Sequence, residues 1–315
     1  MSLISSWGQD NLIPIDNYIR AVWDSIAEMG RVPILPQEVE SGYYTSDELG
    51  ALGEQYVACL LEGLGIKKML PDRKNPSPDF KISIGHRRYL LETKIVRHIH
   101  KRVYQILYEL GRRENRQSLY AKLGRLVTEC KISLSPPQVH FLDERKLKNK
   151  IRRFLSGVRF PVTRPLLRKL VCPLRDYTLR IIPGRPDKEI IWPPENGISL
   201  GAILLRKRRQ IGSSDFLFVT VVGKTSRREV RDLLYPGYNP RNRKILKSIW
   251  ELEYESNGKK KLKIGRRLKA IFFLLPVNKK CLIACPPFKM KSEKIRFWED
   301  YLKKAGYKPI LLFPE

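Results

Sequence analysis

Long apolar runs are absent from the sequence. The longest, "AIFFLLPV" over residues 270–277, has eight residues, whereas a membrane-spanning helix needs roughly 20. The N-terminus, "MSLISSWGQDNLIPID", also lacks the basic residues ahead of an apolar core that mark a secretory signal. We therefore expect a cytoplasmic protein with no membrane association.

Paired cysteines are lacking as well. No two cysteines have the CxxC spacing, and the four histidines do not have zinc-finger spacing. An odd number of scattered cysteines favours buried free thiols in a reducing compartment. The five are Cys59, Cys130, Cys172, Cys281 and Cys285.

Acidic residues are scarce relative to basic ones. Asp and Glu total 32 against 61 Lys and Arg, and the formal net charge is +29. Residues 1–50 are the exception: they hold two basic and eight acidic residues, a net charge of −6, so the remaining 265 residues carry +35. Such an excess favours a polyanionic partner, usually nucleic acid. The acidic N-terminal segment is suited to fold against the basic surface, or to meet a second copy or another protein.

Short apolar runs with the character of strands alternate with amphipathic helical stretches. Residues 45–65 predict a helix, with a capping box at Thr45 and Glu48 and a glycine stop. Buried strands are predicted at 214–224, 268–277 and 279–287, and a further helix at 292–306. This alternation predicts an α/β protein with a mixed sheet. Residues 160–200 are rich in proline, and we interpret them as an insertion.

One stretch, "PSPDFKISIGHRRYLLETK" from Pro76 to Lys94, predicts a hairpin with chemistry at its open end. With a two-residue turn at 85–86, opposed positions have residue numbers that sum to 171, so Asp79 faces Glu92 at roughly 5 Å between Cβ atoms. Because side chains alternate along a strand, Glu92 and Lys94 share one face. The other face is nearly all apolar and should pack on the core: Phe80, Ile82, Ile84, Tyr89, Leu91 and Thr93.

Two opposed carboxylates repel each other unless a cation lies between them. Mg²⁺ suits this position, because it binds a few carboxylate oxygens together with waters and a substrate phosphate. Lys94 is placed to hold a water or a phosphate oxygen beside it. Together these groups provide for metal-assisted hydrolysis of a phosphodiester. The alternative is a surface hairpin on which Lys94 screens two solvated acids.

The same residues resemble the PD-(D/E)XK nuclease superfamily. Pro78-Asp79 matches the PD element, and the Glu92-Thr93-Lys94 tripeptide matches the (D/E)XK element. The preceding stretch, "LGALGEQYVACLLEGLG" over residues 49–65, resembles the first core helix of that superfamily. The resemblance extends over about residues 45–110.

The resemblance implies roles for individual residues. Asp79 and Glu92 would bind Mg²⁺, with Mn²⁺ able to substitute, and the carbonyl of Thr93 would complete the metal site. Lys94 would assist the attacking water, and Glu54 of the preceding helix would help with the metal or the water. Some exonuclease-type members carry a Gln and a Tyr four residues apart on the next helix. In this chain Gln105 and Tyr108 are three apart, which departs from that pattern.

The resemblance also implies an organisation. A restriction-endonuclease-like mixed sheet flanked by helices would occupy residues 45–135. An acidic helical segment, 1–44, would precede it, and a basic mixed α/β region that binds nucleic acid, 136–315, would follow it.

Four basic stretches, 141–170, 206–209, 241–247 and 256–270, predict an extended surface that follows phosphates. Such contacts give salt-dependent affinity without reading the base sequence. The candidate nucleic-acid-binding residues are Lys101, Arg102, Arg206, Lys207, Arg208, Lys259, Lys260, Lys261, Arg266 and Arg267.

We expect a Mg²⁺-dependent nuclease that hydrolyses phosphodiester bonds, in DNA rather than RNA. We favour an endonuclease in defence, mobile-element or DNA-processing biology, following the habits of the family that the chain resembles. One alternative is a non-catalytic DNA- or RNA-binding subunit of a larger complex, in which the hairpin acids are structural. A third hypothesis is an enzyme that acts only as a homodimer or with a partner protein, engaged through the acidic N-terminal segment.

Overall fold

The computed structural model divides the chain into two compact units, which are described separately. The first, here called the sheet unit, comprises Pro14–His98 and Ile203–Glu315. The second, the inserted unit, comprises Met1–Ile13 and Ile99–Ala202. The structure describes residues 13–36, 42–69, 78–84, 86–98, 103, 106–107, 110, 117–136, 139, 143–173, 175–184, 215–235, 250, 253–256, 260–286 and 293–312.

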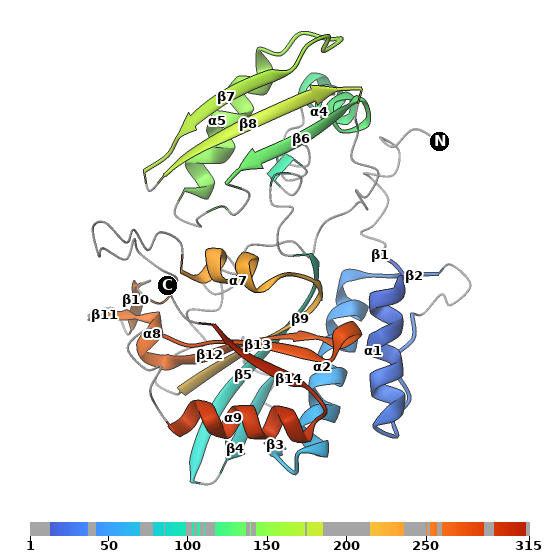
Figure 1. Cartoon of the computed structure of the whole chain (residues 1–315), viewed down its shortest axis with the longest axis vertical. Coiled ribbons are helices and arrows are strands. Elements are labelled where there is room, and N and C mark those ends of the chain that lie inside the picture. Colours follow the sequence, from blue (N-terminus) through green and yellow to red (C-terminus); the bar gives the residue numbers. More distant parts are fainter. Residues whose placement is uncertain are drawn as a thin grey trace. The chain divides into compact units, whose positions relative to one another are not determined.

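A mixed sheet of seven strands forms the centre of the sheet unit (Figure 1). β3, β4 and β5 are antiparallel neighbours, β5, β9 and β12 run parallel, β13 is antiparallel to β12, and β14 is parallel to β13. In spatial order the strands are β14 (Lys308–Leu312), β13 (Lys280–Ala284), β12 (Leu268–Leu275), β9 (Asp215–Lys224), β5 (Arg87–His98), β4 (Phe80–Ile84) and β3 (Lys67–Met69).

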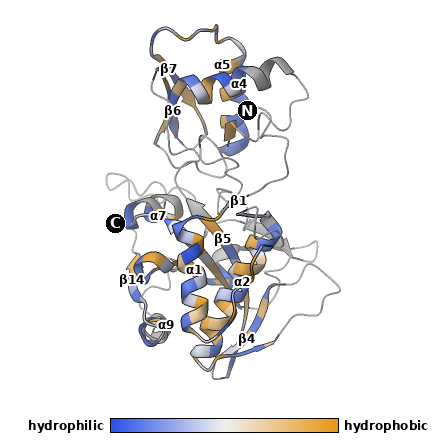
Figure 2. Ribbon diagram, turned by 90° about the vertical axis from the view of Figure 1, so that its right-hand side faces the viewer, coloured by the Kyte–Doolittle hydropathy of each residue, from blue (hydrophilic) through white to orange (hydrophobic). Residues whose placement is uncertain are grey.

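Helices cover both faces of this sheet. α1 (Asn17–Glu28), α2 (Ser46–Gly63) and α9 (Glu293–Lys304) lie on one face, and α7 (Arg227–Leu234) lies on the other (Figure 1). Figure 2 shows hydrophobic residues among hydrophilic ones along α1 and α2, as expected for amphipathic helices. The smaller elements are β1 (Ile13–Pro14), β2 (Tyr43–Tyr44), β10 (Glu253–Ser256), β11 (Lys260–Lys263), α8 (Ile264–Arg267) and the 3-10 helix η5 (Pro276–Asn278).

The ends of α2 agree with the signals in its sequence. The Thr45 hydroxyl accepts a hydrogen bond from the Glu48 backbone, and the Glu48 carboxylate accepts one from the Thr45 N–H, so the predicted capping box is confirmed. At the other end Gly65 adopts a φ of +66°, which glycine tolerates and which stops the helix.

From Pro14 onward, the acidic N-terminal segment belongs to the sheet unit. The Tyr18 hydroxyl of α1 donates a hydrogen bond to the Val221 carbonyl of β9 at 2.8 Å. Lys279, next to η5, forms an ion pair with Glu28 at 2.8 Å and donates to the Ser25 hydroxyl at 3.1 Å. α1 thus packs within the sheet unit, and an engagement of the segment with the basic surface, a second copy or another protein stays a prediction.

The inserted unit contains an antiparallel sheet of order β6-β8-β7, with helices against one face. Its core is apolar and includes Leu147, Ile151 and Leu155, which recur every four residues along α5. Both strands within the proline-rich region, β7 and β8, escaped sequence reasoning. The elements are α4 (Gln117–Glu129), β6 (Cys130–Ser135), α5 (Glu144–Ser156), β7 (Leu166–Val171) and β8 (Asp176–Pro183).

These two units differ from the predicted division into 1–44, 45–135 and 136–315. The reason is a pairing between distant parts of the chain: β5 of the hairpin pairs with β9, which follows the whole inserted unit in sequence. The sheet therefore draws its strands from both ends of the chain.

All five cysteines are buried and free, which confirms the prediction of buried thiols at Cys281 and Cys285. In the described part of the chain, no helix combines the length and apolar composition needed to cross a membrane.

At Gly53, α2 approaches the sheet closely. A Cβ added there would lie 3.1 Å from the Cβ of Ile95 on β5, whereas a Cβ added at Gly50 would have no atom within 4 Å. We expect Gly53→Val to lower the free energy of unfolding by about 1–3 kcal/mol through overpacking. Gly50→Val is the matched control and should leave it nearly unchanged. Urea denaturation of both variants measures the difference, and equal effects would contradict this packing.

Candidate active site

The hairpin of β4 and β5 has the predicted register. Phe80 pairs with Leu91 and Ile84 with Arg87, so opposed residue numbers sum to 171. The predicted register is confirmed for the pairs from Phe80–Leu91 to Ile84–Arg87. Asp79 directly precedes β4 and Glu92 follows Leu91, so both acids adjoin the last pair of this ladder, and their opposed placement stays a prediction.

The Asp79 carboxylate is fixed to the middle residue of the Glu92-Thr93-Lys94 tripeptide. Its Oδ2 accepts a hydrogen bond of 2.6 Å from the Thr93 backbone N–H. Because β4 begins only at Phe80, the Asp79 side chain takes the place of a strand acceptor for this N–H. A short hydrogen bond from an amide to a carboxylate is stronger than one between neutral groups. Asp79 is thus held beside the part of β5 that carries Glu92 and Lys94.

Glu92 is buried within the sheet. Its exposure is 1%, and β5 has β4 on one side and β9 on the other. Removing a carboxylate from water costs several kcal/mol unless cations or hydrogen-bond donors compensate for it. The alternative of a surface hairpin with two solvated acids is wrong for Glu92, because a side chain with 1% exposure is not solvated.

Lys94 lies two residues beyond Glu92 on the same face of β5. It is half-buried, and it forms no ion pair within 4.0 Å with the residues that the structure describes. Its ammonium group is therefore not neutralised by an adjacent carboxylate in the described part of the chain. A cation in this position is available to a water or to a phosphate oxygen.

Thr220 of β9 is a candidate site residue that sequence reasoning missed. It pairs in register with Lys94, so the two side chains share one face of the sheet. Thr220 is 2% exposed, and its hydroxyl oxygen has no hydrogen-bond partner among the described residues. A signal did exist, since it is the one polar residue in the apolar run "FLFVTVV" of residues 216–222. A buried hydroxyl without a partner costs about 1–3 kcal/mol, which suggests that this position serves more than packing.

Thr93 and Glu54 complete the predicted set. The Thr93 side chain lies on the opposite face from Lys94, is 4% exposed, and also has a hydroxyl with no partner among the described residues. Glu54 is exposed on α2, one residue after Gly53, which contacts Ile95 of β5. The structure thus places the helix of Glu54 against the strand of the motif, and the catalytic role of Glu54 stays a prediction.

The residues at the hairpin end fit a Mg²⁺ ion rather than a transition-metal cage. Within the described ranges no three or more His, Cys, Asp or Glu side chains cluster as ligands. Mg²⁺ does not need such a cluster, because it retains waters and accepts substrate phosphate oxygens beside one or two carboxylates. Asp79 and Glu92 supply these carboxylates, and the burial of Glu92 gives the pair a reason to attract a cation.

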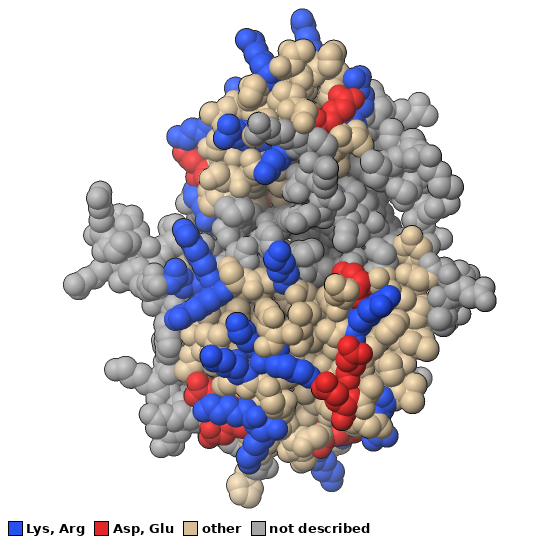
Figure 3. All heavy atoms as spheres, turned by 45° about the vertical axis from the view of Figure 1, so that its right-hand side comes forward, with Lys and Arg blue, Asp and Glu red and all other residues tan. Residues whose placement is uncertain are grey.

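The predicted nucleic-acid contacts fall partly outside the described residues. Lys260 and Lys261 lie on β11, which pairs with β10, and Arg266 and Arg267 lie on α8. Figure 3 shows Lys and Arg side chains spread over the face of the molecule that it displays. The candidates outside the described residues are Lys101, Arg102, Arg206, Lys207, Arg208 and Lys259.

Comparisons with known proteins do not assign the chain to a class. It matches no protein-family model, no curated protein and no solved structure. Its functional interpretation therefore rests on its own residues and their geometry.

The two buried threonines give a prediction about stability. Replacing either hydroxyl with a methyl group, in Thr220→Val or Thr93→Val, removes a buried oxygen that has no hydrogen-bond partner within the described ranges. We expect each variant to raise the free energy of unfolding by about 1 kcal/mol. Chemical denaturation at neutral pH measures the change. A loss of stability in both variants would show that the hydroxyls have partners in solution.

Proposed function

We propose that the protein is a Mg²⁺-dependent nuclease of the PD-(D/E)XK type that hydrolyses phosphodiester bonds in DNA. The observation that carries this proposal is the burial of Glu92 beside Asp79 and Lys94. Two opposed carboxylates, one of them inside a sheet, with a cation on the same face, are costly for a fold and useful for phosphodiester chemistry.

The fold supports the same proposal. A restriction-endonuclease-like mixed sheet flanked by helices was expected from the resemblance, and the sheet unit is a mixed sheet with helices on both faces. The motif hairpin lies inside this sheet, and α2 packs on the strand that carries Glu92. We propose the restriction-endonuclease-like class for this unit.

Each site residue has a role in the proposed reaction. Asp79 and Glu92 would hold the metal ion through carboxylate oxygens, with the Thr93 carbonyl as a third oxygen. A bound Mg²⁺ would polarise the phosphate and stabilise the charge that develops on it. Lys94 would position the attacking water or neutralise a phosphate oxygen, and the Thr220 hydroxyl, beside Lys94, would hold the same water or the lysine. Glu54 is the least constrained member of the set.

Binding of the substrate would rest on the basic residues, because the +29 net charge exceeds what solubility requires. We propose an intracellular endonuclease in defence, mobile-element or DNA-processing biology. A non-catalytic nucleic-acid-binding subunit is the second candidate. The strongly basic composition of the chain favours it, because the positive charge would serve binding whether or not the protein is an enzyme.

Cleavage assays distinguish the two candidates. The purified protein is incubated with circular and linear DNA in Mg²⁺, Mn²⁺ or EDTA. We expect metal-dependent cutting of the circular substrate, abolished by EDTA and reduced at least about 100-fold in Asp79→Asn and in Lys94→Met, since each loses a group that acts on the reacting water or the metal. Tight binding without cutting in any metal would support the binding subunit instead.

The threonine pair provides a matched control within the same sheet. Thr220→Val should reduce the cutting rate about tenfold or more, because its hydroxyl lies on the face of Lys94. Thr93→Val should leave the rate within about twofold, because its hydroxyl lies on the other face and its carbonyl is retained. Equal rates in the two variants would remove Thr220 from the site.

A further inference from the structure

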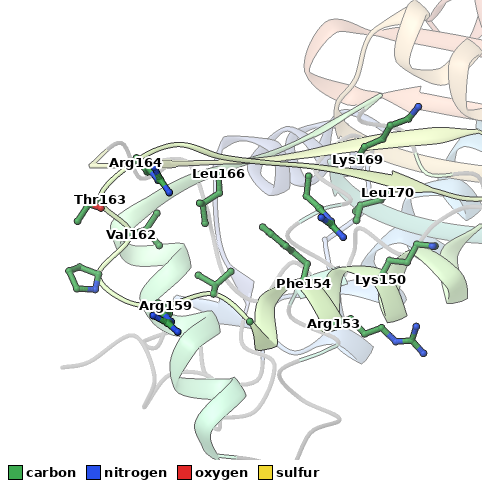
Figure 4. A pocket seen from close by; sticks show the side chains of 14 residues that line it. Lys150, Arg153, Phe154, Arg159, Val162, Thr163, Arg164, Leu166, Lys169 and Leu170 are labelled. Carbon is green, nitrogen blue, oxygen red and sulfur yellow. The ribbon is translucent and has the colours of Figure 1, made fainter.

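A pocket of about 660 Å³ opens on the inserted unit, away from the hairpin in sequence and formed by residues of that unit alone. It lies between α5, the loop that follows α5, and β7 (Figure 4). Its volume falls within the range of pockets that accept small molecules or single nucleotides. The proposed nuclease site does not use any of its residues.

The lining of this pocket is strongly basic. Six of the lining residues are Lys or Arg, and none of the described lining residues is Asp or Glu. Arg159 and Arg164 lie at one end of the view in Figure 4, and Lys150 and Lys169 lie at the other. The six cations are Lys150, Arg153, Arg159, Arg164, Arg168 and Lys169.

Most of these cations are not neutralised. Lys169 forms an ion pair with Asp176 at 2.7 Å. The other five form none within the described part of the chain. Several positive charges around a concave surface raise the local electrostatic potential and attract a polyanion. The ligand that fits this arrangement is a chain of phosphate groups.

The fold itself does not require the cations. α5 buries Leu147, Ile151 and Leu155 in the core of the unit, and Lys150 and Arg153 are exposed beside that apolar face. The positive charges of Lys150 and Arg153 are therefore not needed for the packing of α5.

The centre of the pocket is apolar and aromatic. Phe154 is half-buried, packs against the core of the inserted unit, and points into the pocket together with Leu166 (Figure 4). An aromatic ring surrounded by cations suits an unstacked base whose neighbouring phosphates meet the rim. The bases of a duplex are stacked and paired, so they do not enter such a pocket.

We propose that this pocket binds single-stranded nucleic acid, with Phe154 stacking on a base and Arg153, Arg159 and Arg164 holding the adjacent phosphates. If the protein is the proposed nuclease, its substrate would include a single-stranded segment, and this part of the inference rests on the proposed function. Binding itself is independent of the metal site.

The test is fluorescence anisotropy of the full chain in EDTA, with a labelled 15-nucleotide DNA strand and the corresponding 15-base-pair duplex. Arg159→Gln combined with Arg164→Gln should weaken strand binding at least about tenfold. The slope of log affinity against log salt should fall in magnitude by about 1.4, because each lost phosphate contact on a single strand removes about 0.7. Phe154→Leu should weaken strand binding about tenfold and duplex binding less than twofold.

The control removes the same charge from the same unit. Lys131 and Arg180 are exposed, do not line the pocket, and lie on the face of the β6-β8-β7 sheet opposite Leu166 and Leu170. Lys131→Gln combined with Arg180→Gln should change strand affinity less than twofold. If the two double variants lose affinity equally, only net charge matters and the pocket is overturned. If Phe154→Leu weakens duplex and strand equally, or weakens neither, the single-strand assignment is overturned.

These results separate this proposal from the nuclease. A protein that binds as expected but cuts no DNA in any metal would retain the pocket and lose the proposed activity. A protein that cuts DNA, with the arginine double variant binding as wild type, would retain the activity and lose the pocket. Thermal unfolding of Phe154→Leu confirms that the variant is folded before its affinity is interpreted.

Discussion

Glu92 lies in the middle of a seven-stranded sheet at 1% exposure, and a carboxylate there is stable only where cations or hydrogen-bond donors compensate for the lost water. Much of the structure around it follows from this need. The Thr93 N–H donates to the Asp79 carboxylate, which holds Asp79 at the residue that follows Glu92. Lys94 stands on the same face as Glu92. A divalent cation between the acids would relieve the repulsion that the fold has otherwise to tolerate.

The burial of Glu92 depends on a pairing between distant parts of the chain. β9 runs parallel to β5 from Tyr89 to His98, and it reaches that position only after the entire inserted unit. The same pairing brings Thr220 next to Lys94. The sheet unit thus assembles its candidate site from two segments, and the inserted unit between them carries its own core and its own basic pocket. We propose catalysis for the sheet unit and binding of single-stranded nucleic acid for the inserted unit.

Local features of the site were predictable from the sequence, because they depend on short-range rules. The hairpin register follows from the two-residue turn and the alternation of side chains, and the ends of α2 follow from Thr45, Glu48 and Gly65. β9, β12 and α9 were recognised by their apolar patterns. Each of these elements is predicted by a pattern within about 20 residues of the sequence.

The missing parts depend on long-range pairing. Nothing in residues 76–94 indicates that β9 will cover one side of β5, so these residues alone do not distinguish a buried Glu92 from a solvated one. Thr220 escaped for the same reason, because its neighbour Lys94 is far away in sequence. β7 and β8 escaped because prolines surround them in sequence, which favoured a loop interpretation, and because the exposed Arg168 and Lys169 are adjacent in β7 and break its alternation. The unit boundaries differ from the predicted ranges because the sheet unit takes strands from both sides of the inserted unit. Composition along the chain does not indicate that two such distant segments form one sheet.

The central claim is that Asp79 and Glu92 share a divalent cation. The most direct measurement is anomalous diffraction from a crystal of the protein soaked in Mn²⁺, with a soaked crystal of the Glu92→Gln variant beside it. The account predicts an anomalous peak between the carboxylates of Asp79 and Glu92 in the wild-type protein and its loss in the variant. A wild-type crystal with no peak at this position, or a peak of equal height in the variant, would contradict it.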